Sequence, residues 1–227
     1  MVNKNLSAVI PAAGIGKRVG ATIPKQYLTL LDKTIIEHSL APFLDHPEIK
    51  QVIVSLAEND LWFNALPVAS HPKIKTVVGG AERVDSVLAA LTLIDNEDYV
   101  LVHDAARPCI SVDDIDKLIR QVNCKGQGAI LASRVRDTMK RSDDCNHIIT
   151  TEDRDNLWHA LTPQMFNNKQ LIDAIKNSKQ PEKITDEASA LEMSGLPVTI
   201  VEGRSDNLKI TREEDLKLAA FYLSQGE

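Results

Sequence analysis

The chain has 227 residues, 43% of them hydrophobic, and a formal net charge of −6. This length and composition suit one soluble domain with a sizeable core, and the negative charge argues against a general nucleic-acid-binding surface. No segment approaches the roughly 20 apolar residues of a membrane span, and residues 1–5 lack the hydrophobic region of a signal peptide, so we expect a cytoplasmic protein with no membrane partner.

Short apolar runs rich in β-forming residues predict strands, and amphipathic stretches fall between most of them. The predicted strands are 6–11, 51–56, 75–78, 99–103, 128–133 and 198–202. This alternation predicts an α/β fold, a Rossmann-like and mostly parallel sheet flanked by helices. Apolar residues at helical spacing predict helices packed on the sheet over 84–91 and near 216–223. Thr34 with Glu37, and Thr211 with Glu214, match the capping box that marks a helix start.

The first predicted strand leads into a basic, glycine-rich loop at 11–25. Small residues let backbone N–H groups approach an anion, and nearby cations add positive charge. The small residues are Ala12, Ala13, Gly14 and Gly16, and the cations are Arg18 and Lys25. No hydroxyl residue follows Lys17, which excludes a P-loop, and the third glycine comes one position late for a dinucleotide fingerprint. The loop therefore indicates another kind of phosphate site, or an ordinary turn between strand and helix.

Further polar residues follow other predicted strands, where ligands of open α/β sheets bind. The turn at 79–80 opens a helix that contains Ser86 and could read a polar ligand. Asp104 follows the strand at 99–103 and could meet a ribose hydroxyl or Mg²⁺, or cap a helix. Lys209 lies in a short apolar run, an unusual place for an ammonium group unless it faces a ligand or a carboxylate.

Residues 136–163 interrupt the alternation because they are polar and lack helical periodicity. A turn candidate at 142–146 between β-compatible flanks predicts a two-stranded arm leaving the sheet, with a long surface loop as the alternative. The absence of linker-like or low-complexity segments favours a single domain over 1–227, with the arm at about 136–156. The three cysteines, Cys109, Cys124 and Cys145, lack CxxC spacing, so we expect reduced thiols.

These segments, in this order, resemble the 2-C-methyl-D-erythritol 4-phosphate cytidylyltransferase family over almost the whole chain. The matching segments are 11–18, 24–27, 79–83 with Ser86, 102–108, Arg154, 161–164, 185–187 and 209–211. The resemblance implies a nucleotidyltransferase of the non-mevalonate isoprenoid pathway, in which the phosphate of the substrate attacks the α-phosphorus of CTP and releases pyrophosphate. The attacking group is already an anion, so the catalytic demand is electrostatic and no general base is needed.

The resemblance also implies roles for individual residues. Arg18 and Lys25 would stabilise the transition state, and Mg²⁺ would bridge the CTP phosphates with Asp104 as its candidate ligand. CTP would be held by Ala12, Ala13, Gly14, Gly16, Gly80, Ala81, Ser86, Asp104 and Ala105. Arg154, Thr185 and Lys209 would hold the sugar phosphate, Arg154 and Lys209 with a catalytic role, and Arg107, Thr138 and Thr162 would add polar contacts. The arm would cross to a second subunit and complete its site, which implies a homodimer with shared active sites.

Two alternatives stay open on the sequence. A sister cytidylyltransferase for another polyol phosphate, such as ribitol 5-phosphate, would share the nucleotide half, and residues 24–27 and 103–107 argue against it only by resemblance. A catalytically silent nucleotide-binding module would be expected to lose Arg18, Lys25 or Lys209, and all three are present.

Overall fold

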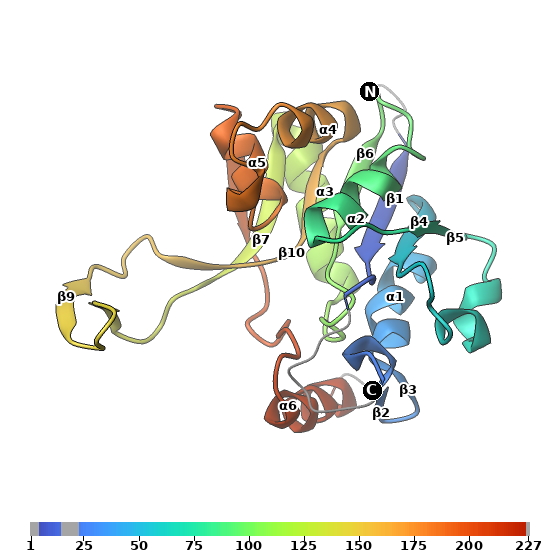
Figure 1. Ribbon diagram of the computed structural model, residues 1–227, viewed down its shortest axis with the longest axis horizontal. Helices are drawn as coiled ribbons and strands as arrows, with labels where there is room; N and C mark the ends of the chain where they lie inside the picture. The colour runs from blue at the N-terminus through green and yellow to red at the C-terminus, as the bar shows by residue number, and fades with distance from the viewer. Residues whose placement is uncertain (1–4, 15–22, 226–227) are drawn as a thin grey trace.

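The computed structural model describes residues 5–14 and 23–225 and is built around one seven-stranded sheet (Figure 1). Its strands lie in the order β11, β7, β10, β6, β1, β4, β5. They are β1 (Leu6–Pro11), β4 (Ile49–Leu56), β5 (Ile74–Val78), β6 (Tyr99–Val102), β7 (Gly128–Arg134), β10 (Trp158–Asn167) and β11 (Val198–Glu202). β10 runs antiparallel to both neighbours, whereas the other adjacent strands pair in parallel. All six predicted strands are present, and the mostly parallel α/β fold is confirmed.

β10 is the strand of the seven-stranded sheet that the sequence analysis missed. Residues 158–163, assigned there to the polar stretch that leaves the sheet, instead form the first part of β10, where residues 158–160 pair with β7. Pro163 has no backbone N–H for a ladder, which normally argues against a central strand. Here the pairing with β7 shifts register between Ala160 and Gln164, so the proline sits where the ladder is already interrupted.

Helices cover both faces of the sheet (Figure 1). They are α1 (Ile35–Asp45), α2 (Arg83–Leu91), α3 (Val112–Lys125), α4 (Asn168–Lys176), α5 (Glu187–Met193) and α6 (Glu213–Ser224). Apolar residues of α1 and α3 share one core cluster with Ala8 and Ile10 of β1, whereas those of α2, α4 and α5 share the other with Val9. Successive residues of a strand point to opposite faces, so β1 is buried from both sides.

The two predicted helix starts had different outcomes. Thr34 caps α1 in a capping box with Glu37, as predicted. The box at Thr211 and Glu214 is wrong, because α6 begins one residue later and the carboxylate of Asp215 accepts the backbone N–H groups of Thr211 and Arg212.

Helix α6 also packs differently from the expectation. It lies against the small hairpin of β2 (Thr29–Leu30) and β3 (Lys33–Thr34), not on the main sheet. Its Ala219 belongs to a third apolar cluster that includes Leu30, Ile35 and Ile210. The helical spacing that revealed α6 carries no information about which surface the apolar face meets.

The polar stretch forms a hairpin, the first of the two alternatives. Strands β8 (Met139–Ser142) and β9 (Ile148–Glu152) pair antiparallel and extend away from the body (Figure 1). Ile148 and Ile149 are more than 60% exposed on β9. Elsewhere, Cys109 is buried and the exposed Cys124 and Cys145 are unpaired. Among the described residues, none of the helices is long and apolar enough to span a membrane.

Candidate active site

A cavity of about 200 Å³ lies at the carboxyl ends of β1 and β6. Five segments of the chain, from both its ends and its middle, line the cavity. The predicted residues in its wall are Ala12, Ala13, Gly14, Lys25, Gly80, Ala81, Ser86, Asp104, Ala105 and Lys209. Gly16 and Arg18 lie outside the described residues. Pro11, Gln26, Glu82, Arg83 and Ala106 complete the lining.

The loop after β1 is held from below by Gln26, in the short 3₁₀ helix η2 (Lys25–Tyr27). Its buried side-chain amide donates to the carbonyls of Ala12, at 2.7 Å, and Gly14, at 3.2 Å. The Ala12 N–H donates to the carbonyl of Ser55 on β4, so this residue still continues the sheet. These bonds fix the backbone that faces the cavity while leaving no side chain larger than a methyl group in the way.

The turn at 79–80 approaches this loop closely because its residues are glycines. A Cβ on Gly79 would lie 2.7 Å from the Ala13 Cβ and from the Ser86 Oγ. The buried Ser86 hydroxyl accepts the Gly80 N–H at 3.2 Å and donates to the Glu82 carbonyl. Ser86 therefore shapes the turn, and any side chain at position 79 would separate the two halves of the wall.

Asp104 is the electrostatic centre of the cavity. Its Oδ1 accepts from Arg83 Nε at 3.0 Å, and its Oδ2 lies 2.9 Å from Lys209 Nζ and 3.5 Å from Arg107 Nε. Burial alone would raise the pKa of Asp104, but the charges of Arg83, Lys209 and Arg107 outweigh it and hold that pKa well below its usual range. Asp104 therefore stays ionised and anchors Lys209 at the cavity wall.

Lys25 lies on the same wall, where its ammonium group donates to the carbonyl of Ile210 at 2.7 Å. The two residues are 185 positions apart in the chain. Lys209 is the neighbour of Ile210, so this bond brings the two predicted cations from opposite ends of the chain into one cavity.

A second cavity of about 230 Å³ adjoins the first, sharing Arg83, Asp104 and Lys209 with it. It is lined by the predicted residues Arg107, Thr162 and Thr185. Arg107 is largely committed to the fold, because its guanidinium donates to the carbonyls of Asn207 and Ala160.

Known proteins of similar sequence and structure point to one family. A family model described as 2-C-methyl-D-erythritol 4-phosphate cytidylyltransferase matches residues 6–225. The chain belongs to this family. It is 56% identical over 221 residues to the family member of Aeromonas hydrophila, covering 97% of this chain and 90% of that one. The member from Vibrio cholerae is 52% identical, with 98% of each chain covered. The crystal structure of the Francisella tularensis cytidylyltransferase superposes with a TM-score of 0.83 at 40% identity, covering 96% of this chain and 100% of that one.

Two of the predicted site residues lie away from both cavities. Arg154 is exposed, lines a separate pocket with Arg134 and Arg136, and donates to the carbonyl of Arg136. Thr138 is exposed at the base of the arm and lines neither of the two adjoining cavities. A single chain therefore does not bring the residues of the arm to the cavity.

Asp104 does not fit the predicted role of metal ligand. Both of its oxygens already contact cationic groups, and a divalent ion bound there would have to displace Lys209 or Arg83 and then face the charge of the displaced group. The sequence suggested a ligand because an aspartate at a strand end looks free until its partners from other segments are known.

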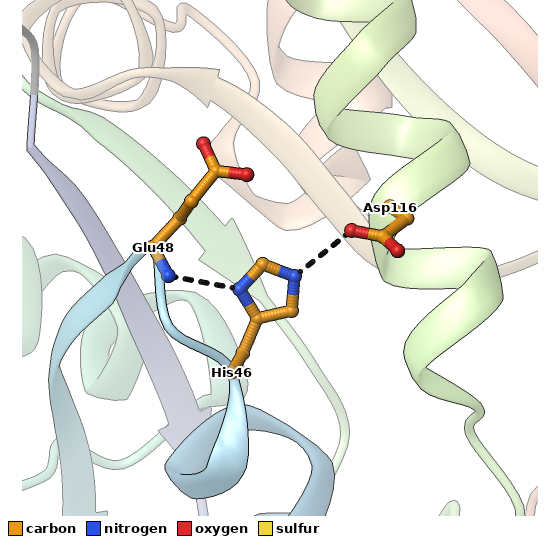
Figure 2. A group of neighbouring side chains, drawn as sticks. All are labelled: His46, Glu48 and Asp116. Carbon is orange, nitrogen blue, oxygen red and sulfur yellow. Dashed lines mark hydrogen bonds and ion pairs between the residues drawn. The ribbon is translucent and has the colours of Figure 1, made fainter.

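The described part of the chain contains one group of His, Asp and Glu close enough to surround a metal: His46, Glu48 and Asp116 (Figure 2). His46 and Glu48 lie just before β4, and Asp116 lies on α3; none of the three lines the cavity. His46 Nδ1 accepts the backbone N–H of Glu48 at 3.2 Å, so Nε2 carries the proton and donates to Asp116 at 3.1 Å. A metal bound to Nε2 would require the proton to sit on Nδ1, where it would face the backbone N–H of Glu48, itself a donor. The group fits a structural His–Asp pair better than a metal site.

Sequence reasoning missed several residues that support the site. The buried His103 accepts the hydroxyl proton of Thr162 at Nδ1 and contacts the Arg107 carbonyl through Nε2, while the Thr162 hydroxyl accepts the Asp104 N–H. Thr162, predicted as a substrate contact, thus uses its hydroxyl to fix the backbone of Asp104. Arg83 and Glu187 stand in the segments that carried the family resemblance, but their pairing spans 104 positions and left no local signal.

Proposed function

We propose that this chain catalyses the reaction of its family, the transfer of a cytidylyl group from CTP to 2-C-methyl-D-erythritol 4-phosphate, with release of pyrophosphate. The products are 4-diphosphocytidyl-2-C-methyl-D-erythritol and pyrophosphate. The observation that carries the proposal is the cavity at the ends of β1 and β6, where two loops of small residues face two lysines. Family membership alone would leave open whether this chain keeps such a site.

The nucleotide is assigned to the part of the cavity between the loop after β1 and the turn at 80–81. Glycine and alanine there expose backbone N–H and C=O groups, the donors and acceptors that can match the 4-amino group and N3 of cytosine. Ala81 has no polar side chain, so the choice of base falls to the backbone. The ribose is assigned to the wall at Asp104 and Ala105, with Ser86 holding the turn.

The chemistry rests on positive charge placed around the α-phosphorus. The phosphate oxygen of the sugar substrate is already ionised and attacks directly, so the protein has to oppose the charge that grows on the phosphoryl oxygens and on the leaving pyrophosphate. Among the described residues, we assign this charge stabilisation to two lysines. The Ile210 carbonyl holds Lys25, and Asp104 holds Lys209. Arg18 belongs to the same proposal on the basis of the sequence.

The sugar phosphate is assigned to the adjoining cavity, with Thr185, Lys209 and Arg107 as contacts. Because Asp104, Arg83 and Lys209 form part of both cavities, the two substrates would meet where Lys209 stands. Mg²⁺ remains part of the proposal as an ion held by the CTP phosphates, and no step is assigned to it. The cytoplasmic location and the single domain over 1–227 are likewise retained from the sequence.

A homodimer with shared sites is included in the proposal. The arm of β8 and β9 is a two-stranded ribbon, which is only marginally stable alone in water and is expected to dock on another surface. Two-fold pairing is the commonest arrangement among homo-oligomers. In such a pair the arm would deliver Arg154 and Thr138 to the partner's sugar-phosphate cavity.

The test is to incubate the protein with CTP, Mg²⁺ and a panel of polyol phosphates while measuring pyrophosphate release. We expect release with 2-C-methyl-D-erythritol 4-phosphate and little with ribitol 5-phosphate. Equal rates for the two would assign the chain to a broader polyol phosphate cytidylyltransferase. Nucleotide binding without release from any acceptor would indicate a silent binding module.

A further inference from the structure

Glu187 is a buried carboxylate that neither substrate is proposed to touch. It is the first residue of α5, and only 2% of it is exposed. Arg83, the first residue of α2, meets it with both terminal nitrogens: Nη1 lies 2.6 Å from Oε1 and Nη2 lies 3.1 Å from Oε2. Burying a carboxylate costs free energy unless it is paired, and this bidentate ion pair with arginine is the strongest form of pairing available to it.

The same guanidinium group also reaches the cavity. Its Nε donates to Asp104, whose other oxygen contacts the ammonium group of Lys209. Charges of alternating sign thus run from Glu187 through Arg83 and Asp104 to Lys209. Burial by itself would lower the pKa of Arg83, but the two carboxylates outweigh it and raise that pKa, so the guanidinium stays charged throughout.

The start of α5 is fixed without Arg83. Gln164 on β10 accepts the Ala188 N–H at 2.9 Å and donates to the Asp186 carboxylate at 2.9 Å. Asp186 also caps the helix by accepting the Ser189 N–H. Loss of the Glu187 charge should therefore leave α5 in place and act mainly on Arg83.

Without that charge, Arg83 would keep Asp104 as its remaining carboxylate partner. Its terminal nitrogens would be free to turn toward Asp104 and compete with Lys209 for Oδ2. We propose that Glu187 is a positioning residue, which holds Arg83 so that Asp104 can keep Lys209 oriented toward the sugar phosphate. This inference rests on the proposed function, because it assigns a supporting residue to that reaction.

Glu187→Gln tests the inference, since it removes the charge and keeps the shape. Glu192→Gln, the same change at an exposed position on α5, is the matched control. We expect Glu187→Gln to lower kcat/KM for 2-C-methyl-D-erythritol 4-phosphate by about 10- to 100-fold, while the calorimetric Kd for CTP stays within about threefold. The control should match the wild type in both. Wild-type kcat/KM in Glu187→Gln, or an equal loss of CTP binding, would overturn the inference.

A second variant separates positioning from general stability. If Glu187 acts through Arg83, then Glu187→Gln should add little further loss to an Arg83→Gln protein, because the contact is already gone. Additive losses in the double variant would contradict the inference. If Glu187→Gln does not fold, Arg83→Gln alone must lower kcat/KM for the sugar phosphate while leaving the Kd for CTP nearly unchanged. A folded Arg83→Gln protein without this difference would overturn the inference. Failure of the proposed function looks different, since the wild type itself would then release no pyrophosphate.

Discussion

Replacing Asp104 with asparagine should destabilise the folded chain strongly. The side chain keeps its size but loses the charge that three cations face: Arg83 at 3.0 Å, Lys209 at 2.9 Å and Arg107 at 3.5 Å. Only 10% of the Asp104 side chain is exposed, whereas 40% of Lys209 and 30% of Arg83 are, so water screens the carboxylate little and these two cations partly. Removing one partner of a fully buried ion pair costs about 3–5 kcal/mol in the free energy of unfolding. Because Lys209 and Arg83 are partly exposed and Arg83 keeps Glu187, we expect a loss at the lower end of that range.

The pH dependence of stability gives a second measure of the same interaction. The pKa of Asp104 is held well below its ordinary value of 3.8 in the folded protein, so the unfolded chain binds the proton more readily. Its contribution to stability is therefore fully present above about pH 4 and is lost as the pH falls further toward the depressed pKa. Asp104→Asn should show a correspondingly smaller loss of stability in that acid range.

Urea unfolding followed by circular dichroism at pH 7 measures the effect. Asp173→Asn is the matched control, because Asp173 pairs with Lys169 on the surface of α4, where both side chains are more than half exposed. Such an exposed pair contributes about 0–1 kcal/mol. If Asp104→Asn costs no more than this control, the buried charge cluster does not have the energetic role assigned to it.

Four further predictions concern catalysis, specificity, acid stability and assembly. Lys25→Ala should lower kcat about 10²- to 10³-fold while weakening CTP binding far less, and Arg18→Ala should do the same. Near-wild-type turnover of either variant in steady-state assays would refute the role of that cation in stabilising the transition state. CTP should be preferred over UTP, because mispaired buried groups around 80–81 cost about 1–3 kcal/mol each, and equal kcat/KM values would contradict this. Burial lowers the pKa of His103 from 6.5 to about 4, so the unfolded chain takes up this proton first and stability should fall as the pH drops from 6.5 to 4. His103→Asn should flatten that part of the urea-unfolding profile, and an unchanged slope would show that His103 does not titrate this way. A mixture of Arg154→Ala and Lys25→Ala protomers should be more active than the sum of the two variants alone, because subunit exchange creates heterodimers in which one site has both cations. Demonstrated subunit exchange without such a gain would rule out shared sites.

The sequence by itself determined the elements that depend on neighbouring residues. The buried run of β1, the glycine loop after it and the capping box at Thr34 are local patterns, and the structure has β1 and the capping box where they were predicted. The segments that carried the family resemblance are local in the same sense, and they led to the family that the comparisons identify. Local chemistry predicted the hairpin of β8 and β9 only as one of two alternatives, because a surface loop was equally open there.

Only the tertiary structure decided which of these segments meet. β10 lies between β7 and β6 because a shifted register accommodates Pro163, a property of the pairing that the strand's own pattern does not contain. The partners of Asp104 come from α2 and from the segment before α6, and they turned a candidate metal ligand into an anchor for Lys209. Distance and burial set the strength of such contacts, and both are determined by the order of the strands, which places distant parts of the chain around one cavity.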